Sequence, residues 1–239
     1  MTRTILVTGG GTGIGLAVAR RFAEDGDAVI VTGRRKQPLV EAAQSIGGTA
    51  VVCDAADPDA WAAVLPDLPE RIDVLVNNAG GNTDFDTGEP AGLAGVAAAW
   101  QANLAANVLT AVLATTAVAD RIPDGGTVVS TGSIAADKGA GAYGAAKAAL
   151  GSWNIDLARQ LGPRGITCNV VSPGYIGDTE FFRDSLTDQR RDLLVSQTAT
   201  KRAGTPADVA GLVHFLASAQ ARQLTGQVIN VNGGAWPTR

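Results

Sequence analysis

Short apolar runs rich in Val, Ile and Thr alternate with longer Ala- and Leu-rich segments along almost the whole chain. A short β-branched run is typical of a strand, and a longer segment with apolar residues at helical spacing is typical of a helix. The pattern predicts seven strands, at residues 4–8, 28–32, 49–53, 72–77, 126–130, 167–172 and 227–231. It also predicts six helices, at residues 14–25, 37–45, 59–64, 95–121, 143–161 and 206–218.

This alternation predicts a parallel sheet whose strands are joined by crossover helices. Right-handed crossovers place helices on both faces, so we expect a single-domain, Rossmann-type, doubly wound α/β fold around a seven-stranded sheet. Ligands of such sheets bind beyond the carboxyl ends of the strands, so functional residues are expected in the loops that follow strands. No repeat or flexible linker divides residues 1–239.

The segment 174–202 does not follow the alternation. It is mostly polar, contains the pair Phe181 and Phe182, and is longer than an ordinary connection. We interpret it as a mobile substrate lid. A solvated, helix-containing insertion without a catalytic role is the alternative.

Composition narrows the possible functions. The chain of 239 residues is 46% hydrophobic, and its formal net charge of −4 argues against nucleic acid as a partner, because phosphate backbones attract clustered Lys and Arg. The first strand begins almost at once, which leaves no room for a secretory signal, and the apolar stretch 104–119 is too short for a membrane span. We therefore expect a soluble, cytoplasmic protein without membrane contact. Cys53, Cys168 and His214 lack partners at metal-ligand spacing, so we expect packed free thiols, a packing or surface role for the histidine, and no metal site.

A glycine-rich loop, Thr8-Gly9-Gly10-Gly11-Thr12-Gly13-Ile14-Gly15, lies between the first predicted strand and the first predicted helix. Glycines let the backbone approach a pyrophosphate closely, and a helix N-terminus offers unpaired N–H groups to an anion. Strand, loop and helix in this order predict a dinucleotide site with Gly9, Thr12, Gly13, Ile14 and Gly15 as cofactor contacts. An ordinary structural turn is the alternative.

The residues after the second predicted strand indicate which dinucleotide binds. An acidic residue about 20 positions beyond the glycine loop usually binds the ribose of NAD. Gly33 stands there instead, and Arg34, Arg35 and Lys36 follow it. A guanidinium can bind a 2′-phosphate, so the sequence favours NADP over NAD, with Arg34 as a ligand; an ordinary basic turn is the alternative.

A second acidic position follows the third predicted strand. Asp54, with Ala55 beside it, is placed to accept a hydrogen bond from the adenine amino group of a bound cofactor. The alternative is that Asp54 caps the next helix.

Tyr143 and Lys147 are four residues apart at the start of a predicted helix and therefore share one face. An ammonium near a phenol lowers the tyrosine pKa and makes the pair a usable acid or base. Ser133 follows a strand at the same carboxyl edge, where its hydroxyl can hold a substrate oxygen. Asn107, in the helix after the fourth strand, can organise a water chain from Lys147 or, alternatively, serve as a core residue bonded to the backbone.

These motifs together resemble the short-chain dehydrogenase/reductase family over nearly the whole chain. The matching residues are the loop at 8–15, Asn77-Asn78-Ala79-Gly80, Asn107, Ser133, the pair Tyr143 and Lys147, Pro173-Gly174 and Asn232-Gly233-Gly234. Within the family, the chain is most similar to the 3-oxoacyl-(acyl-carrier-protein) reductases and related ketoreductases.

The resemblance implies a role for each catalytic residue. Tyr143 would exchange the proton, Ser133 would position the substrate oxygen, and Asn107 would support the relay. Lys147 would lower the pKa of Tyr143 and bind the nicotinamide ribose. The connection from Ser133 to Tyr143 is shorter than is usual in those reductases, which changes the shape of the substrate cleft.

The resemblance also implies further cofactor contacts. Asn77, Ala79 and Gly80 would line the adenosine side, and Ile176 and Thr179 would face the nicotinamide amide. Thr179 departs from the family pattern, because it lies one residue later than the pattern places it.

The resulting hypothesis is NADP(H)-dependent reduction of a ketone, a 3-oxoacyl or related carbonyl that a carrier can present, or the reverse reaction. One alternative is an NAD-dependent secondary-alcohol dehydrogenase. Another is a nucleotide-sensing binding protein without chemistry. The resemblance further implies a homo-tetramer, in which partner helices pack on small residues that could equally face the chain's own sheet: Ala105, Ala106, Ala145, Ala146, Ala148 and Ala149.

Overall fold

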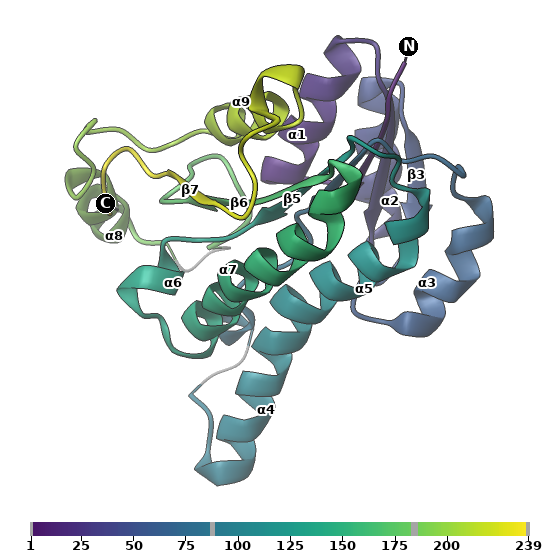
Figure 1. Cartoon of the computed structure of the whole chain (residues 1–239). Helices are drawn as coiled ribbons and strands as arrows, with labels where there is room; N and C mark the ends of the chain where they lie inside the picture. Colours follow the sequence, from purple (N-terminus) through teal and green to yellow (C-terminus); the bar gives the residue numbers. More distant parts are fainter. Residues whose placement is uncertain (1, 87–88, 183–185, 238–239) are drawn as a thin grey trace.

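The computed structural model describes residues 2–86, 89–182 and 186–237, and its centre is a parallel sheet (Figure 1). The seven strands have the order β3-β2-β1-β4-β5-β6-β7. Their bounds are β1 Thr4–Thr8, β2 Ala28–Gly33, β3 Thr49–Val52, β4 Val74–Asn77, β5 Thr127–Thr131, β6 Thr167–Pro173 and β7 Val228–Val231. The winding reverses between β1 and β4, where Thr8 is paired with Asn77. This point is the switch point of a doubly wound sheet, at which ligands bind.

Side chains alternate along each strand and build one core on each face of the sheet. In β1, Ile5 and Val7 join the core that is covered by α1 Gly13–Glu24, α2 Lys36–Ile46 and α9 Pro206–Leu216. Leu6, which lies between them, joins the opposite core, under α3 Pro58–Val64, α5 Thr110–Val118 and α7 Gly141–Leu161. All three side chains are fully buried, as expected for a parallel strand covered on both faces. The predicted fold is confirmed.

A long apolar helical stretch precedes β5. It consists of α4 Gly92–Leu104, a π-helical turn Ala105–Leu109, α5, and a short 3₁₀ turn Ala119–Arg121. The helical stretch 92–121 is long and apolar enough to cross a membrane, and 39% of its most apolar 18-residue segment is buried inside the molecule. The stretch is thus longer than the residues 104–119 that stand out in the sequence. Ala114 and Val118 pack into the core, whereas α4 projects from the body of the molecule (Figure 1).

Two helices were not predicted, and both lack the pattern on which the prediction depends. α6 Ala135–Lys138 is a single turn, too short for an apolar period. α8 Asp188–Ser196 is strongly polar in its first half, and its helical start is fixed by Thr187, whose hydroxyl accepts a hydrogen bond from Arg190 N. The predicted lid, residues 174–202, contains α8; residues 183–185 lie outside the described part of the chain.

The free thiols and the histidine have packing roles, as predicted. Cys53 and Cys168 are buried and unpaired, and burial raises their thiol pKa values to about 11 and about 12. His214 packs on the Phe22 ring at 5.2 Å, and its Nε2 lies 2.7 Å from Asp25 Oδ2.

Candidate active site

The glycine loop has no room for side chains where it approaches β4. Gly9 and Gly13 have φ values of 64° and 54°, in the left-handed region that favours glycine. A Cβ at Gly9 would lie 2.8 Å from Ala79 Cα. A Cβ at Gly15 would collide with the Gly9 carbonyl oxygen and lie 2.5 Å from Asn78 Nδ2. The loop is therefore built from glycine because its backbone is in direct contact with its neighbours.

The N-terminus of α1 is free to bind an anion. Thr12 is the N-cap residue, but its side chain makes no capping hydrogen bond, and no acidic residue lies in the first turn. The first N–H groups of the helix thus lack a side-chain cap, and no carboxylate in the first turn offsets the partial positive charge of the helix end. Together with the close-packed loop, this arrangement fits the pyrophosphate of a dinucleotide. The predicted contacts at Gly9, Thr12, Gly13, Ile14 and Gly15 all lie at this junction.

Asn78, not Asn77, faces the glycine loop. Asn78 Nδ2 donates to Gly9 O at 3.1 Å, and its Oδ1 accepts from Thr131 Oγ1 at 3.2 Å. Thr8 Oγ1 accepts from the backbone N–H groups of Asn78 and Ala79, both at 3.1 Å. These contacts join the ends of β1, β4 and β5.

The side chain of Asn77 points away from the crevice. It is 4% exposed, and its Nδ2 donates to Thr115 Oγ1 at 2.9 Å in the core beneath α5. Only the backbone of Asn77 is available to line a cofactor, whereas Ala79 and Gly80 lie in the turn at the crevice. The strand alternation that ends at residue 77 gives the reason, because successive side chains point to opposite sides.

The basic turn after β2 is partly paired. Arg35 Nη2 donates to Glu180 Oε2 at 2.6 Å, across 145 residues of chain. Asp54 accepts from Ala56 N at 3.1 Å, so its carboxylate shapes the turn after β3. The N-cap of α3 is Asp57, which accepts from Asp59 N at 2.9 Å; the alternative role of Asp54 as a helix cap is therefore wrong.

Ala55 contributes only its backbone to that turn. Its side chain is buried, and its carbonyl oxygen accepts a hydrogen bond from Trp61 Nε1 at 3.1 Å.

Ser133, Tyr143 and Lys147 come together at the carboxyl edge of β5. The Ser133 hydroxyl hydrogen bonds to the Tyr143 phenol, and its oxygen accepts from Ala135 N at 3.1 Å. Lys147 Nζ lies 5.9 Å from the centre of the Tyr143 ring and donates to Thr131 O at 2.8 Å. Tyr143 and Lys147 are on α7, as their spacing predicts, and are 6% and 5% exposed. The group can hold an oxygen atom and exchange a proton with it.

Burial sets the protonation of this group. It raises the pKa of Tyr143 from 10.0 to about 12, and the hydrogen bond from Ser133 offsets only part of that effect. It lowers the pKa of Lys147 from 10.5 to about 8. The pKa of Tyr143 is thus raised and not brought toward neutral pH as the sequence led us to expect, because desolvation of the phenolate dominates. At pH 7 the phenol is neutral and the ammonium is charged.

Asn107 lies in the π-helical turn between α4 and α5. Its Oδ1 accepts from Gly81 N at 3.1 Å, and its Nδ2 donates to the carbonyl oxygens of Gly81 and Asn103 at 2.9 and 3.0 Å. A Cβ at Gly80 would lie 2.7 Å from Asn107 Oδ1 and 3.4 Å from Lys147 Nζ. Gly80 therefore separates the amide from the ammonium, and Asn107 anchors the turn after β4 through backbone hydrogen bonds.

The first part of the predicted lid crosses the glycine loop. Ile176 forms a bridge with Gly204 and is buried in the core, so its side chain is turned away from the crevice. Thr179 Oγ1 donates to Ile176 O at 3.3 Å, and its methyl carbon lies 3.6 Å from where a Cβ at Gly13 would be. Thr179 thus lies over the start of α1.

Aromatic rings close the space above the phenol. The Phe181 ring lies 5.7 Å from that of Tyr143 and 5.8 Å from that of Phe85, which belongs to the loop after β4. Phe182 contacts Phe181, Phe85 and Tyr175. The space above the phenol is thus lined by aromatic rings, and the sequence alone did not reveal the part played by Phe85.

Fold and site together define a dinucleotide-binding oxidoreductase. A family model described as Enoyl-(Acyl carrier protein) reductase matches residues 9–235. The chain belongs to the short-chain dehydrogenase/reductase family.

Individual relatives have different printed functions. The chain is 37% identical to the cyclic-di-GMP-binding biofilm dispersal mediator protein of Escherichia coli (strain K12), over 97% of this chain and 96% of that protein. It is 36% identical to the 3-oxoacyl-[acyl-carrier-protein] reductase MabA of Mycobacterium bovis, over 98% and 93%. The crystal structure of BdcA in complex with NADPH is similar with a TM-score of 0.85 and 38% identity, over 97% and 93%.

Proposed function

We propose that the chain reduces a ketone with NADPH, or oxidises the corresponding alcohol, through Ser133, Tyr143 and Lys147. The observation that carries the proposal is the convergence of these three side chains beside an uncapped helix N-terminus. The similarity to a 3-oxoacyl reductase supports a 3-oxoacyl or related carbonyl as the substrate. The two free, buried thiols are consistent with a reducing, cytoplasmic location.

The protonation of the site suits the reductive direction. A bound nicotinamide supplies or accepts the hydride. Ser133 holds the substrate oxygen against the phenol, and Tyr143, which burial keeps neutral, donates the proton to that oxygen. Lys147 remains charged at pH 7, since its pKa of about 8 lies above this pH, and stabilises the phenolate that proton transfer leaves. Asn107 keeps the turn at Gly80 and Gly81 in place beside the ammonium.

A tyrosine variant tests the chemistry. Tyr143→Phe keeps the ring but removes the proton donor, so ketone-dependent oxidation of NADPH should be lost while NADPH still binds. The matched control is Tyr175→Phe, because Tyr175 is the other tyrosine of the chain and contacts Phe182 rather than Ser133. A panel of ketones followed by NADPH absorbance gives the measurement. Turnover by Tyr143→Phe at nearly the wild-type rate would exclude the proposed mechanism.

Arg34 and Arg35 support NADP as the cofactor. Because Arg34 follows β2 directly, Arg34→Ala should weaken NADPH binding far more than NADH binding. Equal losses for the two cofactors would instead favour an NAD-dependent alcohol dehydrogenase.

A second candidate is a protein that binds a cyclic dinucleotide. It is favoured by one finding, the 37% identity to a relative whose name describes cyclic-di-GMP binding. Calorimetric titration with cyclic-di-GMP and with NADPH distinguishes the two functions. Binding of cyclic-di-GMP in the absence of any ketone-dependent turnover would favour the second candidate.

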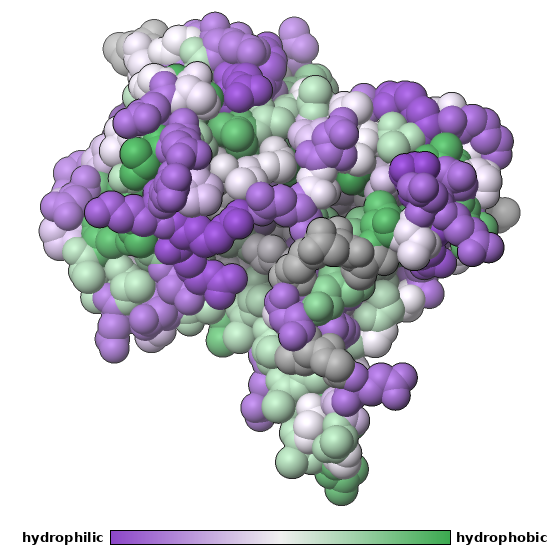
Figure 2. Space-filling model, turned by 180° about the vertical axis from the view of Figure 1, so that it is seen from behind, coloured by the Kyte–Doolittle hydropathy of each residue, from purple (hydrophilic) through white to green (hydrophobic). Residues whose placement is uncertain are grey.

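The proposed assembly is a homo-tetramer. Leu93, Val96 and Trp100 are exposed on α4, which Figure 2 shows as a largely apolar projection. Ala145 and Ala148 are exposed on α7, whereas Ala146 is buried in the chain's own core. Light scattering should give a mass of four chains, and Trp100→Glu should lower it. A monomeric wild-type protein would refute this assembly.

A further inference from the structure

One ion pair connects the predicted lid to the basic turn after β2. Arg35 Nη2 and Glu180 Oε2 lie 2.6 Å apart, and both side chains are 62% exposed. The carboxylate occupies one of the five N–H donors of the guanidinium, which leaves the other donors for a second anion. The pair therefore places a negative charge on the residue next to Arg34, which is expected to bind the 2′-phosphate of NADP.

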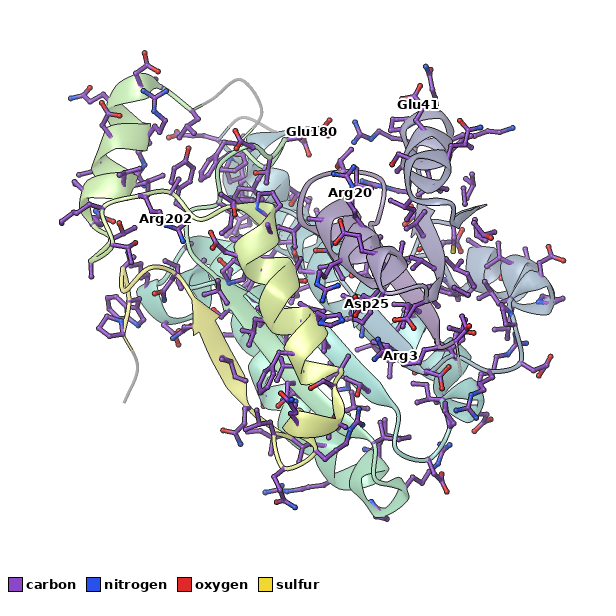
Figure 3. All side chains as sticks on the ribbon, turned by 90° about the horizontal axis from the view of Figure 1, so that it is seen from above. Arg3, Arg20, Asp25, Glu41, Glu180 and Arg202 are labelled. Carbon is purple, nitrogen blue, oxygen red and sulfur yellow. The ribbon has the colours of Figure 1, made fainter. Side chains whose placement is uncertain are left out.

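The neighbouring residues fix this position of Glu180. The bridge between Ile176 and Gly204 holds the root of the segment, and Asp178, with a φ of 55°, turns the chain back toward the glycine loop. Thr179 then lies over Gly13, at the start of α1. Residues 179 and 180 thus run from the N-terminus of α1 to the basic turn, which is the path from the pyrophosphate to the adenosine ribose. Figure 3 shows Glu180 on the side of the lid that faces α1 and α2, the helices that carry Arg20 and Glu41.

We propose that Glu180 is a second determinant of cofactor choice, which reduces the preference for NADP over NAD. The proposal rests on the proposed function, because it assumes a nicotinamide dinucleotide in the crevice. The 2′-phosphate of NADP carries about two negative charges, so a carboxylate held in the basic turn beside Arg34 repels it and competes for the donors of Arg35. The 2′-hydroxyl of NAD is neutral and experiences little of either effect. Arg34 and Arg35 therefore favour NADP, and the lid opposes them in part.

The test is a comparison of dissociation constants, measured by calorimetry and by NADPH or NADH fluorescence, for the wild type and Glu180→Gln. Glu180→Gln should tighten NADPH binding by about two- to five-fold, the range of an exposed charge pair, and leave NADH binding unchanged. The difference should shrink in high salt, since exposed charges are screened. Glu41→Gln is the matched control: it removes an exposed carboxylate from α2 that contacts Gln37, and it should change neither constant.

The outcomes separate this inference from the function on which it rests. If Glu180→Gln weakens both cofactors equally, the ion pair closes the lid over any dinucleotide, and the inference is wrong. An unchanged ratio of the two constants also overturns it. If the wild type binds neither NADPH nor NADH, it is the proposed function that fails.

Discussion

The buried ammonium of Lys147 leads to a quantitative prediction about stability. Burial lowers its pKa from 10.5 to about 8, so the charged form present at pH 7 is disfavoured in the folded chain. At about 1.4 kcal/mol per pKa unit, this desolvation amounts to about 3 kcal/mol. Lys147→Met removes the charge and leaves the Thr131 carbonyl without its hydrogen bond, which costs about 1 to 2 kcal/mol. We therefore expect the variant to be inactive but more stable at pH 7, by about 1 to 2 kcal/mol.

The sign of the pH dependence follows from proton linkage. The unfolded chain keeps the Lys147 proton up to a pKa near 10.5, whereas the folded chain releases it near 8. Between these values the unfolded state holds more protons, so the stability of the wild type rises with pH across this window. The penalty is present in full below about pH 8. The advantage of Lys147→Met should accordingly be largest at neutral pH and vanish or reverse by about pH 10.

Urea unfolding followed by circular dichroism between pH 7 and pH 10, without cofactor, measures this difference. Lys138→Met is the control, because Lys138 is exposed and contacts only the Gln197 side chain and the Trp236 ring among the contacts described. Its difference from the wild type should not depend on pH. The reasoning about Lys147 is refuted if Lys147→Met differs from the wild type by the same free energy at every pH.

Three further variants test other parts of the site. Gly15→Ala places a methyl group against the backbone of the glycine loop and should abolish dinucleotide binding and lower the melting temperature. The control Gly211→Ala, at an open position of α9, should stabilise the folded chain by about 0.5–1 kcal/mol. Similar calorimetric traces for the two variants would show that the glycine loop has room for a methyl group. Asn78→Ala removes two hydrogen bonds between strand ends and should weaken NADPH binding about tenfold, so an unchanged dissociation constant contradicts its role. Phe181→Ala admits water to the phenol and should bring the pKa of Tyr143 down from about 12 toward 10.0. The absorbance of the phenolate measures this pKa, with Tyr143→Phe as the blank. An unchanged pKa means that the Phe181 ring does not shield the phenol from water.

The sheet and the edge that carries the site could be predicted because they follow from local patterns. β-branched runs and helical segments alternate with little ambiguity, and parallel strands bring their carboxyl ends to one edge. Ser133 and the pair of Tyr143 and Lys147 each follow from position relative to a strand or from helical spacing. Their convergence in the structure therefore needed no information beyond the order of the elements.

Properties that depend on burial or on long-range contact were beyond the sequence pattern. The pKa of Tyr143 is raised because the surrounding rings exclude water, and Phe85 and Phe181 reach it from separate loops. Asn77 and Asn78 are identical in type, and only the exact end of β4 decides which one faces the crevice. Glu180 contacts Arg35 across 145 residues of chain. A prediction of the cofactor from the residues that follow β2 therefore cannot include the effect of Glu180.

Gly80 couples two parts of the crevice through the turn after β4. Its φ is 157°, and a Cβ there would lie 2.7 Å from Asn107 Oδ1 and 3.4 Å from Lys147 Nζ, so the turn has no room for a side chain beside the ammonium. The same turn packs on the glycine loop through Ala79, whose Cα would lie 2.8 Å from a Cβ at Gly9. A substitution at position 80 would therefore disturb the ammonium and the glycine loop together, so these two parts of the crevice are constrained to change in concert.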